Sequence, residues 1–192
     1  MMHKIIKCGL IGGFVLFIWG AVSWSVLPWQ KNQMQTFSNE SEVRSALGDR
    51  GNASGLYLVP NVYGYSNDPA GLAKAQGKMK EGPFAFVSLT AEGKNPSSAG
   101  SVIASLIVKI VGASLATWLL LKTASPMGYT KVVQYITMIG ILLAVMSMVP
   151  LMIWFGFPAN YVIGSMIDIV FGWFFAGLAI ARIVMPVHKA KA

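Results

Sequence analysis

Cysteine, histidine and acidic side chains are scarce in this chain. Among its 192 residues are one cysteine, two histidines and seven acidic residues. The single cysteine, Cys8, excludes a disulfide within the chain, and the Cys/His count is too low for a zinc site. His3 and His188 stand near the two ends of the chain, where neither could ligate a haem inside a bundle. We therefore expect no metal and no other cofactor.

Charge of either sign is also limited. Only 11% of the residues are charged, against about a quarter in an ordinary soluble domain. Apolar residues make up 55% of the chain, and the mean hydropathy is +0.59. These residues gather in four runs, at 8–27, 99–121, 132–155 and 161–181. Each run is long enough to cross a bilayer core of about 30 Å as a helix.

The four runs predict an all-α membrane bundle of four transmembrane helices. A small α+β extracytoplasmic loop domain is expected between the first and second helices. The expected parts are residues 1–28 (N-terminus and first helix), 29–98 (loop domain) and 99–192 (three helices and C-terminus). The first run is longer than the apolar part of a signal peptide and ends in a poor cleavage sequence, so we expect it to be retained.

Within the loop domain, strand patterns cover 55–59 and 84–90, and a short helix is expected over 39–47. Asp68 followed by Pro69 is typical of a helix start, although Gly71 and Gly77 disfavour a helix after it. Two strands alone are marginal in water, so their apolar side chains need cover. That cover could come from the bilayer surface, from the helix ends or from another protein.

The basic residues divide unevenly between the two ends of the predicted helices. Seven of them, and no acid, flank the helices at the two chain termini and in the short second loop. The 29–98 segment instead carries seven basic and six acidic residues. The positive-inside rule then places both termini in the cytoplasm and the 29–98 loop outside. A chain of this kind fits a bacterial inner membrane, and its positive charge fits anionic lipid rather than nucleic acid.

Two charges lie inside the predicted helices. Lys109 is about 15 Å into the second helix and Asp168 about 10 Å into the fourth, both counted from the outer end. An unpaired charge at this depth costs at least about 2.5–3.5 kcal/mol, so a mutual pair is expected. The pair could fix the helix register or could couple to a proton or cation. One of the charges could also pair with another subunit.

Small residues accompany these charges. Gly164 and Gly172 flank Asp168 at a spacing of four residues, and Gly9, Gly13 and Gly20 lie near one face of the first helix. Such faces allow close helix packing. Packing within the bundle is the favoured interpretation, and packing against a second copy is the alternative.

No motif for catalysis or nucleotide binding is present, so we expect a non-catalytic protein. The favoured function is an accessory or assembly subunit of a larger inner-membrane complex, with the lipid bilayer and other membrane subunits, or a second copy, as partners. The first alternative is a small proton- or ion-coupled transporter or channel that uses Lys109 and Asp168. The second alternative is an outer-face sensor or lipid-binding protein.

Overall fold

The chain folds into two compact units in a computed structural model, which describes residues 1–31, 33–48, 53–65, 67–123 and 127–185. The first, which we call the membrane unit, comprises Met1–Met34, Pro96–Val149 and Ala159–Ala192. The second, the loop unit, comprises Gln35–Asn95 and Pro150–Pro158. The loop unit therefore includes the last residues of one long helix and the turn that follows.

Four helices in the described part of the chain are long and apolar enough to cross a membrane. They are α1 (Met2–Ser25), α5 (Ala99–Leu121), α6 (Tyr129–Phe155) and α7 (Ala159–Val184). The four predicted spans are thus helices in the structure, and the chain is a multi-pass membrane protein. Helix α5 has the predicted bounds and α6 and α7 are longer, whereas α1 begins earlier because the basic turn with Lys4 and Lys7 is also helical.

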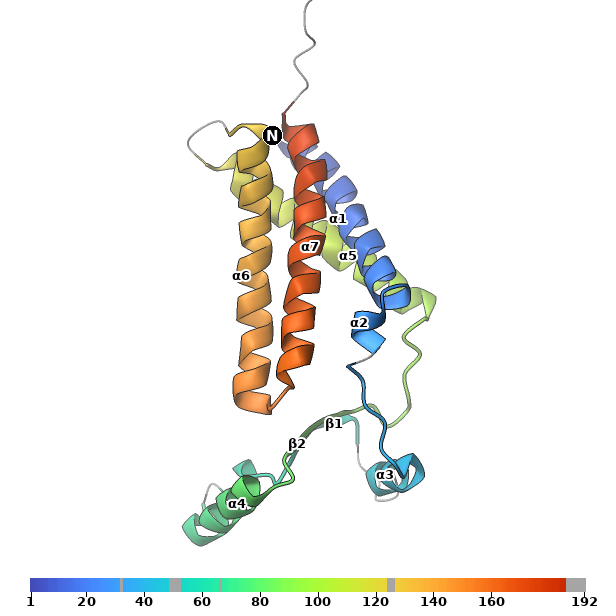
Figure 1. Ribbon diagram of the computed structural model, residues 1–192, viewed down its shortest axis with the longest axis vertical. Coiled ribbons are helices and arrows are strands. Elements are labelled where there is room, and N and C mark those ends of the chain that lie inside the picture. Colours follow the sequence, from blue (N-terminus) through green and yellow to red (C-terminus); the bar gives the residue numbers. More distant parts are fainter. Residues whose placement is uncertain (32, 49–52, 66, 124–126, 186–192) are drawn as a thin grey trace, which may run out of the picture. The chain divides into compact units, whose positions relative to one another are not determined.

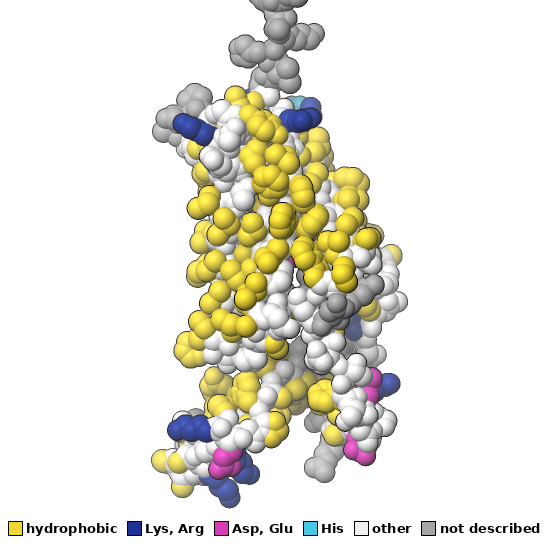
Figure 2. Space-filling view, in the orientation of Figure 1, with side chains coloured by type: hydrophobic (Ala, Val, Ile, Leu, Met, Phe, Trp, Pro, Cys, Tyr) yellow, Lys and Arg dark blue, Asp and Glu magenta, His cyan; other side chains and the backbone are white. Residues whose placement is uncertain are grey.

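Helices α1 and α7 are the two inner helices of the membrane unit. Helix α1 packs against both α5 and α7, and α6 packs on α7 (Figure 1). Helices α1 and α6 run in one direction and α5 and α7 in the other, so the chain's N-terminus lies beside the end of α7 (Figure 1). Hydrophobic side chains cover most of the visible helix surface, and basic side chains lie at the end where α1 begins (Figure 2).

Close helix contacts are made where small residues replace side chains. A Cβ atom at Gly13 would lie 2.5 Å from the Ile110 Cα of α5, and the indole of Trp173 in α7 lies over Gly140 of α6. The core between these helices is a single cluster of buried apolar side chains. Its members come from all four long helices and include Leu16, Ala116, Ile136, Trp173 and Ile180.

The loop unit contains short helices and a two-stranded sheet. Its elements are α3 (Glu40–Gly48), β1 (Gly55–Val59), the 3-10 turn η1 (Tyr63–Tyr65), α4 (Pro69–Glu81) and β2 (Ala85–Leu89). The strands are antiparallel, with Gly55 opposite Leu89 and Val59 opposite Ala85. Both strands and α3 thus form close to the positions that the sequence predicts. A further short helix, α2 (Pro28–Lys31), follows α1 in the membrane unit and was not expected.

The helix start predicted from Asp68 and Pro69 is confirmed, since α4 begins at Pro69. Its glycines do not prevent it, because the Asp68 carboxylate accepts a hydrogen bond from the Gly71 backbone N–H at 3.0 Å and thereby caps α4. Part of the cover for the sheet comes from the same unit. The rings of Phe86 in β2 and Phe155 at the end of α6 lie 4.5 Å apart between centroids.

Candidate functional site

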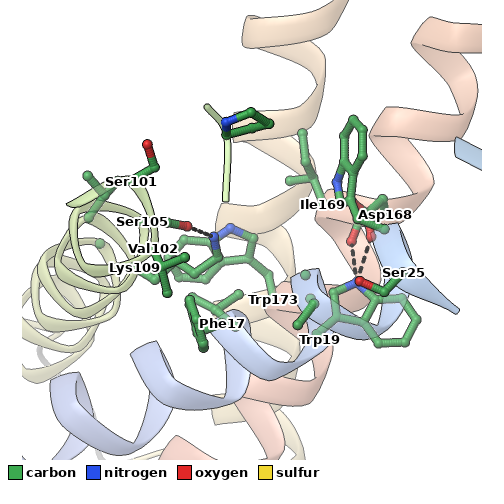
Figure 3. Close-up of a pocket in the computed structure, with 18 of the residues that line it drawn as sticks. Phe17, Trp19, Ser25, Ser101, Val102, Ser105, Lys109, Asp168, Ile169 and Trp173 are labelled. Carbon is green, nitrogen blue, oxygen red and sulfur yellow. Dashed lines mark hydrogen bonds between the residues drawn. The ribbon is translucent and has the colours of Figure 1, made fainter. Parts of the chain in front are cut away.

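A pocket of about 920 Å³ opens in the membrane unit between α1, α5 and α7 (Figure 3). Both charges predicted inside the helices, Lys109 and Asp168, line it. Residues of α1 and α7 form one part of the wall and residues of α5 another, and Leu143 of α6 completes it. The residues that link the end of the loop to α5, Pro96 and Ser97, also line it. The pocket thus extends from the N-terminal end of α5 to the depth of Lys109.

Lys109 directs its ammonium toward the N-terminal end of α5. Its Nζ donates a hydrogen bond to the Ser105 hydroxyl, one turn earlier, at 3.0 Å (Figure 3). This direction agrees with the general tilt of helical side chains toward the helix N-terminus. It also brings the charge nearer to the membrane surface than the Cα position implies, as is usual for lysine in membranes.

A row of serines leads to Lys109: Ser101 and Ser105 lie on the same face of α5, and Ser97 lies just before the helix begins. Ser97, Ser101 and Ser105 precede Lys109 at intervals of four residues, and all four residues line the pocket. A spacing of four keeps side chains on one helix face. The result is a polar track from the N-terminal end of α5 to a positive charge, with apolar surface on either side.

Asp168 is held by Trp19, which lies in the C-terminal third of α1. The indole Nε1 of Trp19 donates to the Asp168 Oδ1 at 2.8 Å and to the Asp168 backbone carbonyl at 3.0 Å (Figure 3). The Trp19 ring in turn packs against Phe175 of α7, with 4.9 Å between the ring centroids. Helix α1 therefore fixes the position of the carboxylate on α7.

The two charges come together in one pocket but approach it from different helices, α5 for Lys109 and α7 for Asp168 (Figure 3). Opposite charges in a shared, mostly apolar cavity attract each other more strongly than they would in water. Lys109 donates a hydrogen bond to Ser105, and Asp168 accepts one from Trp19. A direct Lys109–Asp168 ion pair stays a prediction, as does pairing with another subunit.

The predicted small residues lie against other segments of the membrane unit. A Cβ atom at each glycine would come within 4 Å of one of these neighbours: Ser114 for Gly9, Ile110 for Gly13, Lys109 for Gly20, Gln33 for Gly164 and Trp19 for Gly172. Two of the five, Gly20 and Gly172, line the pocket. The absence of side chains there helps to create the space beside Lys109 and Trp19.

Sequence reasoning missed Trp19 and the serine row. The row has a signal, because Ser97, Ser101, Ser105 and Lys109 share one periodicity, but serines near a helix start are also common as caps. Ser98 is the N-cap of α5, where its hydroxyl accepts from the Ser101 N–H at 3.3 Å. No sequence pattern around Trp19 predicts its contact with Asp168, because that contact depends on which helix packs beside α1.

The wall of the pocket has a polar part and an apolar part. The charged and hydroxyl groups lie on part of the wall, and the rest is formed by side chains such as Leu16, Phe17, Leu143 and Ile169. A pocket of this composition accommodates a molecule with a polar end and an apolar body. Among the described residues, no three His, Cys, Asp or Glu side chains gather where they could hold a metal ion.

Comparison with protein-family models, with curated proteins and with solved structures gives no match for this chain.

Proposed function

We propose that this chain is a non-catalytic membrane protein that binds an amphipathic ligand within its helix bundle. The observation that supports this most is the pocket that holds Lys109, Asp168 and the serine row among apolar side chains. An intramembrane charge is costly, so its retention in a cavity favours a binding role over a purely passive one. The sequence places its lipid-binding alternative at the outer face, whereas this proposal places binding in the pocket within the helix bundle.

The same proposal includes the location of the protein. The uneven distribution of basic residues supports a bacterial inner membrane, with both termini in the cytoplasm and the 29–98 loop outside. The N-terminal end of α5, where the pocket begins, would then face the outer side of the membrane. A ligand would enter from the outer leaflet or from the outer aqueous phase.

Retention of a ligand by the purified protein tests this function. The full chain, extracted in a mild non-ionic detergent, should carry a small molecule of defined mass in native mass spectrometry. Gly20→Leu should reduce the retained fraction by about tenfold or more, because a Cβ at Gly20 already lies 3.6 Å from the Lys109 Cε and a larger side chain would fill the pocket.

Ala104→Leu is the matched control. It adds the same side chain to an exposed position of α5 that does not line the pocket. It should retain the ligand as the unsubstituted protein does. Equal retention by the Gly20→Leu protein, or no retained molecule in any of the proteins, would contradict a ligand-binding function.

A second candidate function, the accessory subunit, is supported by a separate observation. In the loop unit, Leu56, Val59 and Tyr63 expose between 52% and 80% of their surface, and none of them belongs to a membrane-spanning helix. Exposed apolar side chains outside the membrane are typical of surfaces that contact another protein. Mild-detergent extraction from native membranes, followed by mass analysis, should recover another protein in a fixed ratio if this function holds. A lone monomer or homo-oligomer would exclude it.

A further inference from the structure

The polar and apolar parts of the pocket are arranged as an amphiphile would require. The serine row leads to the Lys109 ammonium along α5, and the facing walls contribute Phe17, Ile169 and Trp173. A free hydrated anion would gain nothing from these apolar walls, whereas an acyl chain would bury against them. The pocket also begins near the predicted outer edge of the bilayer, where lipid headgroups lie. Its walls therefore favour a lipid over a small soluble anion.

The charges in the walls restrict the headgroup. A lysine ammonium has three N–H donors and Ser105 accepts from one of them, so Lys109 can also donate to a phosphate oxygen. Charge-assisted hydrogen bonds of this kind are among the stronger ones. Asp168 in α7 would repel a headgroup with excess negative charge and would attract an amine.

We infer that the pocket binds a zwitterionic aminophospholipid, with the phosphate at Lys109 and the amine on the side of Asp168. This inference rests on the proposed function, because it names the ligand of the same pocket. The phosphate group enters along Ser97, Ser101 and Ser105, and an acyl chain lies against the apolar wall. A pocket lined by one ammonium and one carboxylate is complementary to a headgroup that carries both a negative phosphate and a positive amine.

A lipid competition measures this selectivity directly. The full chain in non-ionic detergent is exposed to equal amounts of phosphatidylethanolamine and phosphatidylglycerol, which share a phosphate but differ in the amine, and the retained lipid is identified by native mass spectrometry. The unsubstituted protein should retain mainly phosphatidylethanolamine. Equal retention of both lipids, or a preference for phosphatidylglycerol, would overturn the inference without any variant.

Three variants test the roles of Lys109 and Asp168 in binding the headgroup. Lys109→Met should weaken retention of both lipids by about tenfold or more, because a charge-assisted hydrogen bond is lost. Lys131→Met removes the same charge at an exposed position outside the pocket and should leave retention unchanged. Asp168→Asn should keep the phosphate contact but reduce the preference for phosphatidylethanolamine. Unchanged retention in the Lys109→Met protein would overturn the phosphate assignment.

Inorganic phosphate distinguishes the two possible sources of the anion. If millimolar inorganic phosphate binds to the protein while neither phospholipid is retained, the pocket recognises a free anion and the inference is wrong. The Gly20→Leu protein separates failure of the inference from failure of the proposed function. A protein that loses its ligand on Gly20→Leu but shows no headgroup preference still binds an amphiphile, whereas one that keeps its ligand does not use this pocket.

Discussion

The indole N–H of Trp19 in α1 donates a hydrogen bond to the Asp168 carboxylate in α7 at 2.8 Å. This bond ties the C-terminal third of α1 to the only acidic residue in the four apolar runs of the sequence. It gives the carboxylate a fixed position in the pocket wall.

Replacing the donor should weaken the fold. Trp19→Phe retains an aromatic ring against Phe175 but removes the N–H, and hydrogen bonds to charged groups are worth about 1.5–3 kcal/mol. We expect the free energy of unfolding in detergent to fall by about that amount. Trp29→Phe, which removes a bond of 3.0 Å to the neutral Ser23 hydroxyl, should cost only about 1 kcal/mol. Equal stability of the Trp19→Phe and unsubstituted proteins would show that the bond contributes nothing.

Lys109 and Asp168 should be energetically coupled. Lys109→Met and Asp168→Asn should each destabilise the protein, and the double variant should be less destabilised than the two single effects together predict, by about 0.5 kcal/mol or more. Exchanging the two residues should not restore stability, because the Trp19 N–H would then face a lysine at position 168. Unfolding of the four proteins in detergent measures the coupling.

The control cycle combines Asp168→Asn with Lys131→Met, since Lys131 is exposed and lies outside the pocket. Its effects should add within about 0.3–0.5 kcal/mol. If the Lys109 cycle is equally additive, the shared pocket does not couple the charges.

Two glycines of α1 should respond differently to alanine. At Gly13 the new Cβ would lie 2.5 Å from the backbone of Ile110, which cannot move without separating α1 from α5. Gly13→Ala should therefore cost about 1–3 kcal/mol, as overpacking does. At Gly20 the nearest atom, the Lys109 Cε, would be at an ordinary 3.6 Å, so Gly20→Ala should be neutral or slightly stabilising. Thermal unfolding of the two proteins compares them, and equal losses would contradict the packing that we describe.

The loop unit contains a carboxyl whose pKa is lowered by hydrogen bonds, and the largest contribution comes from one hydroxyl. Ser54 donates to Glu92 at 2.7 Å and accepts from the Ala91 N–H at 2.9 Å, which joins the residue before β1 to those after β2. This hydrogen bond holds the pKa of Glu92 below its usual range. The stabilisation is thus present above the unfolded-state pKa and is lost as the pH falls through the folded-state pKa.

Ser54→Ala should raise the pKa of Glu92 toward its usual range, as measured by carboxyl NMR titration of the full chain. Ser88→Ala alters an exposed hydroxyl within β2 and should leave the pKa of Glu92 unchanged. An unchanged pKa of Glu92 in the Ser54→Ala protein would mean that another group lowers it.

Much of the fold is encoded in local patterns. The apolar run at 99–121 has the bounds of α5, and the strand pattern at 55–59 has the bounds of β1, because length and periodicity determine such elements within the chain. The pocket is different. The sequence identifies Lys109 and Asp168 as charges that are costly to place inside a membrane. Their neighbours Trp19 and Gly20, however, belong to a helix far away in the chain. Which helices pack together depends on side-chain fit, which no local pattern contains.

The contact between Phe86 and Phe155 illustrates the same limit. The strand pattern at 84–90 shows that its apolar side chains need cover, yet the ring that supplies part of this cover is at the end of α6, some distance along the chain. Conversely, the periodicity of Ser97, Ser101, Ser105 and Lys109 is visible in the sequence. The periodicity alone does not show that these residues line a pocket. That conclusion requires the structure, which shows which face of α5 lies inside the membrane unit.

The central claim is that a lipid occupies the pocket beside Lys109, and thiol labelling of Ser105→Cys tests it most directly. Cys8 is buried, so the unsubstituted protein gives the background rate for a small neutral maleimide. With phosphatidylethanolamine added to the detergent, we predict several-fold slower labelling at position 105 and little change for Ala104→Cys, the exposed neighbour. The same labelling rate at position 105 with and without the lipid would contradict the account.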